Sequence, residues 1–251
     1  MFIKFHIADG VATLAFDRPD KKNAITRAMY QSLADGLTSA ANDKSVRTIV
    51  ITGEGGIFTA GNDVEEFLKY PPQPGDSHVT LFMNALRDAE KPVIASVSGM
   101  AIGIGTTLLM HCDLVYAAEN ARFAMPFTQL GLCPEFASSY LFPRLAGYQR
   151  AAEKLLLGEA FLADEAAQMG LVSKVMPADA LSSFVAAQAA KLVALPAESL
   201  RITKQLMKKD RAAGVDAAMQ DELQHFIRLL QEPDAKEAFS AFLEKRKPVF
   251  S

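Results

Sequence analysis

The stretch GMAIGIGTT at residues 99–107 decides the fold class of this chain. It follows the apolar run VIASV at 93–97 and leads into a second apolar run, LLM at 108–110, which predicts a helix. Gly103 and Gly105 carry no side chain, so a ligand can approach the backbone closely there. A helix start presents unpaired N–H groups and a partial positive charge. A strand, a glycine turn and a helix start together indicate an α/β protein that can bind a negatively charged oxygen.

The same pattern of a short apolar strand recurs on both sides of this stretch. The runs TIVI at 48–51 and LVYA at 114–117 also predict buried strands, and helical stretches separate the three runs. Residues 2–7 and 11–16 predict a hairpin around the Asp9-Gly10 turn. Buried strands that alternate with helices are typical of an α/β core with a parallel sheet.

From Pro177 onward the pattern is almost wholly helical. Pro196, Gly214 and Pro233 divide it into about four predicted helices. Nearer the N-terminus, Ile25 begins a four-residue apolar spacing that also predicts a helix.

Composition limits the classes of function. The chain has 251 residues, 50% of them hydrophobic, which is enough for one compact domain. Its 26 basic and 29 acidic residues provide no surplus of positive charge for nucleic acid. Cys112 and Cys133 form neither a disulfide framework nor a metal-binding pattern. With no run of about 20 apolar residues and no signal peptide, we expect a cytoplasmic protein without a membrane span or a metal.

Two further segments join the central glycine turn: IFTAGND at 57–63 and LGLCPE at 130–135. Each segment alone is common punctuation between strands and helices. In this order and spacing they resemble the crotonase (enoyl-CoA hydratase/isomerase) superfamily. The resemblance covers the whole chain and includes further short motifs: DRP at 17–19, NAI at 23–25, NARF at 120–123, FPRL at 142–145 and AFLEKRKP at 241–248.

The resemblance implies a crotonase-like spiral of ββα units with a C-terminal α-helical trimerisation region. Residues 1–190 would form the spiral core with an acyl-CoA site, and residues 191–251 the helical oligomerisation region. The expected assembly is a homotrimer or a dimer of trimers. CoA would enter as part of the substrate, with no tightly bound cofactor.

The resemblance also implies a site. The backbone N–H groups of Asn62 and Ile104 would form an oxyanion hole that stabilises the enolate of an acyl-CoA thioester. Contacts with CoA or substrate are carried over to six further positions: Lys22, Ala24, Ile25, Ala60, Asp63 and Gly103.

The reaction depends on carboxylates. Family hydratases use two glutamates, but the matching positions here are Thr107 and Phe127, which cannot act as carboxylate bases. Glu135 remains, and its Pro-Glu pair is similar to peroxisomal-type Δ3,Δ2-enoyl-CoA isomerases, although Phe136 stands where those enzymes usually have glycine. Apolar neighbours should raise the Glu135 pKa, and one base is enough for an isomerase.

Other interpretations stay open at the level of sequence. Glu135 could be a helix N-terminal glutamate stabilised by the helix dipole. The chain could be an enoyl-CoA hydratase or a non-catalytic acyl-CoA-binding module. Clp serine proteases share the fold, and their triad would need Ser96 or Ser98 with His111 and Asp113.

Overall fold

A six-stranded sheet forms the frame of the computed structural model, which describes residues 2–71 and 77–250. The first two strands form the predicted antiparallel hairpin, and the other neighbouring strands pair in parallel. In sheet order the strands are β1 (Ile3–Ala8), β2 (Val11–Phe16), β3 (Thr48–Gly53), β4 (Val93–Val97), β6 (Leu114–Ala118) and β9 (Lys174–Met176).

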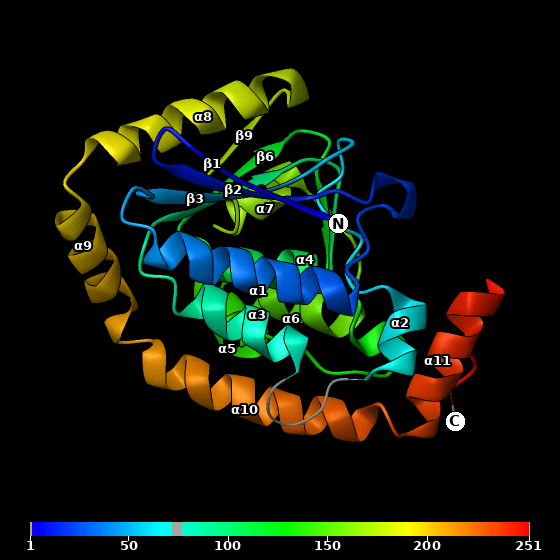
Figure 1. Ribbon diagram of the computed structural model, residues 1–251. Coiled ribbons are helices and arrows are strands. Elements are labelled where there is room, and N and C mark those ends of the chain that lie inside the picture. Colours follow the sequence, from blue (N-terminus) through cyan, green and yellow to red (C-terminus); the bar gives the residue numbers. More distant parts are fainter. Residues whose placement is uncertain (1, 72–76, 251) are drawn as a thin grey trace.

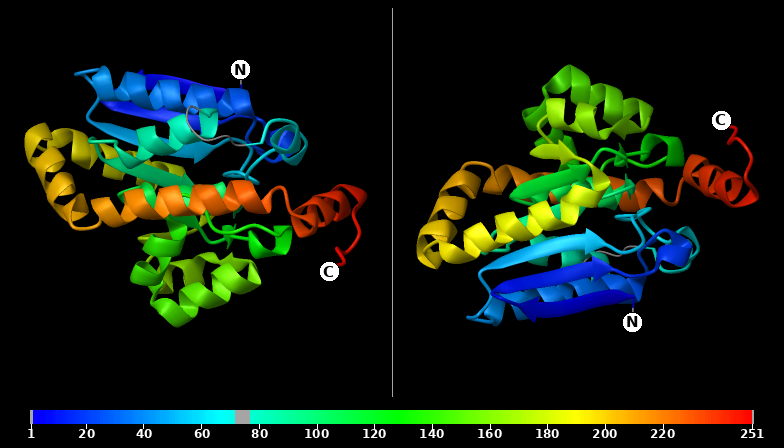
Figure 2. Two further views of the ribbon diagram at one scale, coloured as in Figure 1. Left: turned by 90° about the horizontal axis from the view of Figure 1, so that it is seen from below. Right: turned by 90° about the horizontal axis from the view of Figure 1, so that it is seen from above.

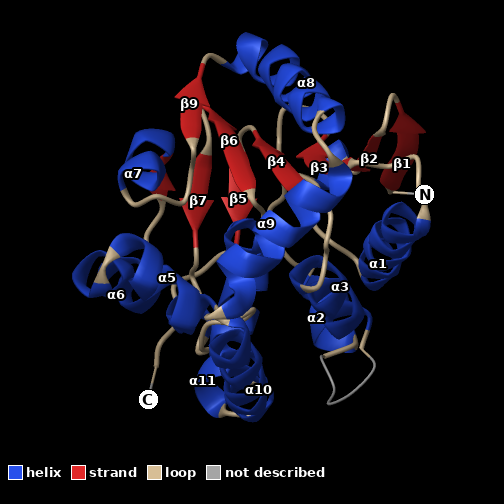
Figure 3. Ribbon diagram, turned by 90° about the vertical axis from the view of Figure 1, so that its left-hand side faces the viewer, coloured by secondary structure: helices blue, strands red, loops and turns tan. Residues whose placement is uncertain are grey.

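A second, three-stranded sheet continues from the first. It contains β5 (Met100–Ile102), β7 (Arg122–Ala124) and β8 (Phe161–Leu162). The chain passes from β4 into β5 at Gly99, where φ is +62° and a Cβ would lie 2.5 Å from the Gly56 carbonyl oxygen. In the same way β6 leads into β7, and Figure 3 shows the small sheet continuing beyond the large one. These successive turns form the spiral of ββα units that the family resemblance implied.

Helices cover both faces of the large sheet (Figure 1). The helix α8 (Ala178–Ala194) packs on one face, and α1 (Arg27–Asn42) and α3 (His78–Arg87) lie on the other. The other helices of the core are α2 (Val64–Lys69), α4 (Ile104–Thr107), α5 (Ser138–Ala146), α6 (Tyr148–Leu157) and α7 (Ala163–Gln168), with three 3-10 turns, η1 (Pro19–Lys21), η2 (Leu108–His111) and η3 (Thr128–Leu130).

The prediction that Ile25 belongs to the first helix is wrong. Thr26 caps this helix by accepting a hydrogen bond from the Met29 N–H at 3.3 Å, so α1 begins at Arg27. Ile25 instead forms a parallel β-bridge with Asn62. The helix start therefore brings the chain alongside the segment that is predicted to bind the oxyanion.

Four helices follow residue 177, as predicted. After α8, the helices α9 (Ala197–Lys209), α10 (Ala212–Leu229) and α11 (Pro233–Glu244) run in succession around the outside of the core (Figures 1 and 2). Gly214 is not a boundary, because it lies within α10, where a Cβ would be 2.3 Å from the Tyr140 ring. The predicted boundary between the spiral core and the helical region, after residue 190, lies inside α8. This helix ends at Ala194, and Leu195 and Pro196 connect it to α9.

The helices α9, α10 and α11, here called the wrapping helices, are anchored to the core of their own chain. Lys204 of α9 is buried and binds Asp113 at 2.6 Å. Phe67 of α2 packs against Phe226 of α10 and Phe239 of α11, with ring centroids 6.1 and 6.0 Å away. Within the described residues no single helix is long and apolar enough to cross a membrane; only the pair α8 and α9, bent by 106°, passes that test together.

Candidate active site

Two glycine turns run side by side at the centre of the molecule. The Thr59 N–H donates to the Met100 carbonyl at 2.8 Å, and the Ile102 N–H donates to the Thr59 carbonyl at 3.1 Å. These bonds form a parallel β-bridge between Thr59 and Ala101. Asn62 comes three residues after Thr59, and Ile104 comes three residues after Ala101. The register of the parallel bridge therefore places the two predicted oxyanion donors opposite each other.

The backbone of both turns requires glycine. Gly61 has φ of +86°, and a Cβ there would lie 2.7 Å from the Ile102 carbonyl oxygen. Gly103 has φ of 57° and ψ of −119°, a conformation that residues with a side chain rarely adopt. The helix α4 begins directly after this turn, at Ile104, ahead of the apolar run at 108–110 that predicted a helix. After Thr107 it tightens into the 3-10 turn η2.

The two N–H groups are free to bind a ligand. Neither the Asn62 N–H nor the Ile104 N–H has a hydrogen-bond partner within residues 2–71 and 77–250. Both residues line a cavity of about 530 Å³, together with Ala60, Gly103 and Glu135. Preorganised N–H donors in a partly enclosed site stabilise charge that develops on a carbonyl oxygen. The structure therefore gathers five of the predicted site residues around one cavity.

Tyr30 supports this arrangement and carried no signal in the sequence. Its hydroxyl donates a hydrogen bond to Oδ1 of Asn62. The ring is buried in α1, and burial, with a smaller contribution from the charge of Glu135, raises the Tyr30 pKa well above its usual range. Tyr30 therefore stays a neutral donor that orients Asn62.

The segment predicted to contact CoA runs along the first glycine turn. The Ala60 N–H donates to the Lys22 carbonyl at 2.9 Å, and the Asp63 N–H donates to the Ile25 carbonyl at 3.0 Å. Ile25 and Asp63 line a second cavity of about 400 Å³ that adjoins the first at Asn62. Lys22 and Ala24 line neither of these two cavities, and the Lys22 side chain is exposed.

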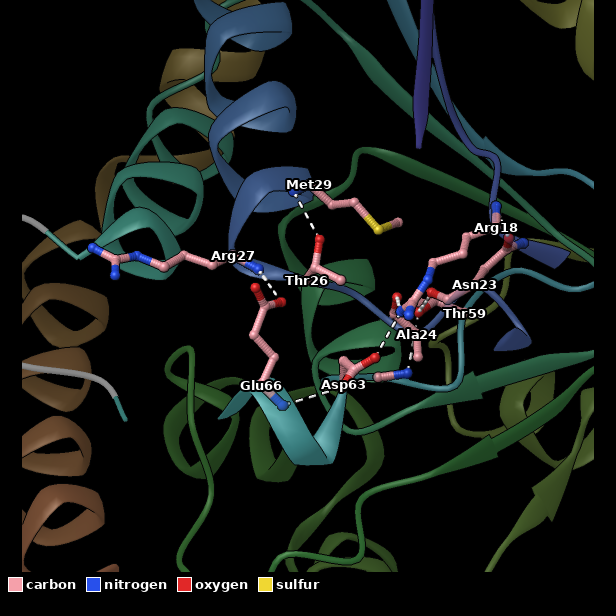
Figure 4. Close-up of polar contacts among 10 residues, drawn as sticks. Arg18, Asn23, Ala24, Thr26, Arg27, Met29, Thr59, Asp63 and Glu66 are labelled. Atoms are coloured by element: carbon pink, nitrogen blue, oxygen red, sulfur yellow. Dashed lines mark hydrogen bonds and ion pairs between the residues drawn. The ribbon is translucent and has the colours of Figure 1, made fainter. Parts of the chain in front are cut away.

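The Asp63 carboxylate is bound by protein groups (Figure 4). Nη1 of Arg18 donates to Oδ2 of Asp63 at 2.7 Å and to the Ala24 carbonyl at 3.1 Å. Oδ1 of Asp63 caps α2 by accepting from the Glu66 N–H at 3.2 Å. Burial would raise the Asp63 pKa, but the hydrogen bonds from Arg18 and Glu66 outweigh it and hold the pKa below its usual value. Asp63 thus joins the segment of Arg18 and Ala24 to the start of α2. Its contact with CoA stays a prediction.

Glu135 is buried at the edge of the cavity of about 530 Å³, which is the main cavity of the site. Its Oε1 has no hydrogen-bond partner among the residues that the structure describes. Burial, and then the charge of Glu222, raise the Glu135 pKa to about 8, in the direction that its apolar neighbours predicted. A carboxyl with such a pKa can take up and release a proton near neutral pH.

The sequence also allowed Glu135 to be a glutamate that is bound at a helix N-terminus. In the structure another glutamate takes that position. The helix α5 begins at Ser138, and the N–H groups of Ala137 and Ser139 donate to the carboxylate of Glu222 at 2.6 and 2.9 Å. Glu222 lies on α10, 85 residues after Ala137 in the sequence. No local pattern could have indicated this contact.

Phe136, which stands where glycine was expected, adopts the left-handed conformation that glycine favours. Its φ is 59°, and that of Ala137 is 55°. The Phe136 ring stacks on His111, with centroids 3.8 Å apart, and Nε2 of His111 donates to the Phe136 carbonyl at 2.8 Å. Burial lowers the His111 pKa to about 3, so the ring is neutral. Packing and this hydrogen bond hold the strained turn that follows Glu135.

A serine protease triad is not formed. Asp113 binds Lys204, Ser98 binds Asn120, and no hydrogen bond joins His111 to Asp113 or to either candidate serine in the described part of the chain. The described residues also contain no group of three or more His, Cys, Asp or Glu side chains that could hold a metal ion.

Comparison with known proteins shows the family of this chain. The model of the enoyl-CoA hydratase/isomerase family matches residues 6–251. Enoyl-CoA delta isomerase 2 of Rattus norvegicus is 38% identical over 219 residues, covering 85% of this chain and 56% of that protein, so the chain spans about half the length of this relative. The 2,3-dehydroadipyl-CoA hydratase of Escherichia coli is 35% identical over 242 residues, covering 96% and 94%. A solved enoyl-CoA hydratase/isomerase of Pseudoalteromonas atlantica has a TM-score of 0.95 at 37% identity and covers 100% of both chains.

The family model extends over nearly the whole chain, and the structural similarity extends over all of it. Both agree with the motifs at residues 57–63, 99–107 and 130–135. The chain therefore belongs to the enoyl-CoA hydratase/isomerase family.

Proposed function

We propose that this protein is a Δ3,Δ2-enoyl-CoA isomerase that uses Glu135 as its base. One observation carries the proposal: Glu135 provides the one carboxyl group among the described residues that line the main cavity, and the same cavity contains the free N–H groups of Asn62 and Ile104. An isomerase needs one base and an oxyanion hole.

The mechanism follows from these three groups. The thioester oxygen of a 3-enoyl-CoA accepts hydrogen bonds from the Asn62 and Ile104 N–H groups. Glu135 takes a proton from C2, and the electron pair delocalises over a dienolate whose charge rests on the thioester oxygen. The protonated Glu135 then returns the proton to C4. The double bond moves from C3–C4 to C2–C3, and the enzyme regains its starting state.

Hydration is the second candidate and receives less support. A hydratase positions water between two carboxyl groups, one acting as acid and one as base. Thr107 is buried and its hydroxyl faces the Ile104 carbonyl at 3.5 Å, while Phe127 contributes an apolar ring to the cavity. Neither side chain can perform the work of a second carboxylate near neutral pH.

A separate cavity lies beyond Glu135 and could hold the acyl tail. A space of about 440 Å³ lies between α3 and α10 and adjoins the main cavity at Glu135, Phe67 and Phe226. Met83 and Leu223 are among its apolar lining residues. With C4 of the substrate beside Glu135, the next carbons of the chain would extend into this space. We propose that it binds the tail of a medium or long acyl chain.

A bulky side chain in the cavity between α3 and α10 should restrict the length of the acyl chain. We expect Leu223→Trp to lower kcat/KM for a 3-dodecenoyl-CoA by roughly tenfold or more, because the indole would displace several methylene groups. A 3-hexenoyl-CoA should react at nearly the original rate. Ile7→Trp, on the exposed face of β1, is the matched control. Equal losses for both chain lengths would contradict the placement of the tail.

The decisive experiment offers the purified protein a 3-enoyl-CoA and, separately, a 2-enoyl-CoA in water. Conversion of the 3-enoyl to the 2-enoyl thioester would support the isomerase. Rapid hydration of the 2-enoyl thioester would overturn it and favour the hydratase. Tight CoA binding without either reaction would favour the non-catalytic acyl-CoA-binding module.

We also propose that the protein forms a homotrimer or a dimer of trimers. Large apolar side chains stay exposed on the wrapping helix α9, where Leu206 is 65% and Met207 is 68% exposed. Such side chains favour association with another surface. Light scattering should give three or six times the chain mass of 27.2 kDa, and a monomeric mass would contradict the proposal.

A further inference from the structure

The Glu222 carboxylate of α10 is buried against the segment that carries Glu135. Its side chain accepts the Ala137 N–H at 2.6 Å and the Ser139 N–H at 2.9 Å, and the Ser139 hydroxyl also donates to it. The residue is 6% exposed. These bonds satisfy N–H groups at the start of α5 that would otherwise lack a partner.

The turn that Glu222 holds is strained. Phe136 and Ala137 both have positive φ although neither is glycine. Such a conformation is costly for a residue with a side chain and persists only where its surroundings enforce it. Glu135 comes directly before this turn, and both glutamates line the cavity between α3 and α10. The turn therefore decides where the Glu135 carboxyl points.

Charge couples the two glutamates as well. Two buried carboxyl groups at one cavity resist simultaneous ionisation, and the Glu222 charge adds to burial in raising the Glu135 pKa. Arg87 is held between Asp88 and Asp216, so its charge is largely balanced. Besides Arg87, four titratable or charged groups among the described residues face Glu135. They are Tyr30 of α1, Cys133 of the same loop, Asp216 at the cavity between α3 and α10, and Arg246 at the main cavity.

We propose that Glu222 is a positioning residue for the isomerisation. It holds the Phe136–Ala137 turn so that the Glu135 carboxyl stands free in the cavity, and its own carboxylate lines the same cavity. This inference rests on the proposed function. The C-terminal helices, which the sequence indicated only for oligomerisation, then also contribute to the chemistry of the site.

Two substitutions test charge and geometry. Glu222→Gln removes the charge and keeps one carbonyl oxygen, so it can accept the N–H group of Ala137 or of Ser139 but not both. We expect the ascending limb of the kcat/KM–pH profile to move to lower pH, because Glu135 then ionises more easily. Glu222→Asp keeps the charge but shortens the side chain. We expect kcat to fall by roughly 10- to 100-fold, because the turn and Glu135 shift. Glu198→Gln removes a charge from an exposed residue of α9 and should change neither.

NMR titration of Glu135, assigned by comparison with Glu135→Gln, follows its ionisation without turnover. A lower Glu135 pKa in Glu222→Gln supports the proposal even if the wild-type protein does not isomerise 3-enoyl-CoA, so the two failures are distinguishable. If Glu222→Gln does not fold, the kcat of Glu222→Asp decides the positioning role. An unchanged Glu135 pKa in folded Glu222→Gln, or wild-type kcat in Glu222→Asp, would overturn the proposal.

Discussion

Replacing Glu135 with glutamine is expected to lower kcat for 3-enoyl-CoA isomerisation by roughly 10² to 10⁴. The amide keeps the size of the side chain but cannot take a proton from C2. Asn62 and Ile104 are untouched, so KM should change little. Stopped or continuous assays of 2-enoyl-CoA formation measure the effect. Glu198→Gln, at an exposed glutamate of α9 that does not line the main cavity, is the matched control and should keep full activity.

The same Glu135→Gln variant should be more stable than the wild type at high pH. The Glu135 pKa is raised from 4.5 to about 8 in the folded protein. A group with a raised folded pKa contributes its full stability below pH 4.5 and loses it as the pH rises to 8, because over that range the unfolded carboxyl ionises while the buried one stays protonated. Glutamine does not titrate. At pH 9 we expect a gain in unfolding free energy on the order of 5 kcal/mol.

Denaturant melts at pH 5 and pH 9 measure this difference. A gain that grows from pH 5 to pH 9, together with lost turnover, would show a folded protein whose base alone is missing. An equal effect at both pH values would contradict the raised Glu135 pKa. Retained isomerase activity in the variant would assign the base to another residue.

The second large effect concerns the oxyanion hole. Gly61→Ala should lower kcat/KM by roughly 10² to 10³, which is the cost of losing one oxyanion donor. A Cβ at this position would lie 2.7 Å from the Ile102 carbonyl oxygen, so the two glycine turns must separate. The Asn62 N–H would then move away from the Ile104 N–H.

Gly56→Ala distinguishes this effect from simple backbone strain. Gly56 also has a positive φ, +71°, but an added Cβ meets nothing within 4 Å. Both variants should lose about 1 kcal/mol of stability from the left-handed backbone. Only Gly61→Ala should lose turnover. Equal kcat/KM values for the two variants would show that the spacing of the two turns does not matter for the reaction.

Local pattern predicted most of the architecture. The apolar runs at 48–51, 93–97 and 114–117 became strands of one parallel sheet, and four helices follow residue 177. The error at Ile25 has a local cause, because a cap at Thr26 starts α1 two residues later. The error at Gly214 has a distant cause, because Gly214 lies within α10 and makes room for the Tyr140 ring of α5. Spacing alone could not reveal this packing partner.

By itself, the sequence determined the fold class, and its resemblance to the enoyl-CoA hydratase/isomerase family implied the candidate groups of the site: Asn62, Ile104 and Glu135. Glycine turns and buried strands depend on short stretches of chain, so they can be recognised from residue type and spacing. Only the tertiary structure decided that both N–H groups lack a partner among the described residues, that Tyr30 binds Asn62 and that Glu222 replaces Glu135 at the start of α5. Burial and contacts between distant segments determine proton affinity and orientation, and neither is encoded in local sequence.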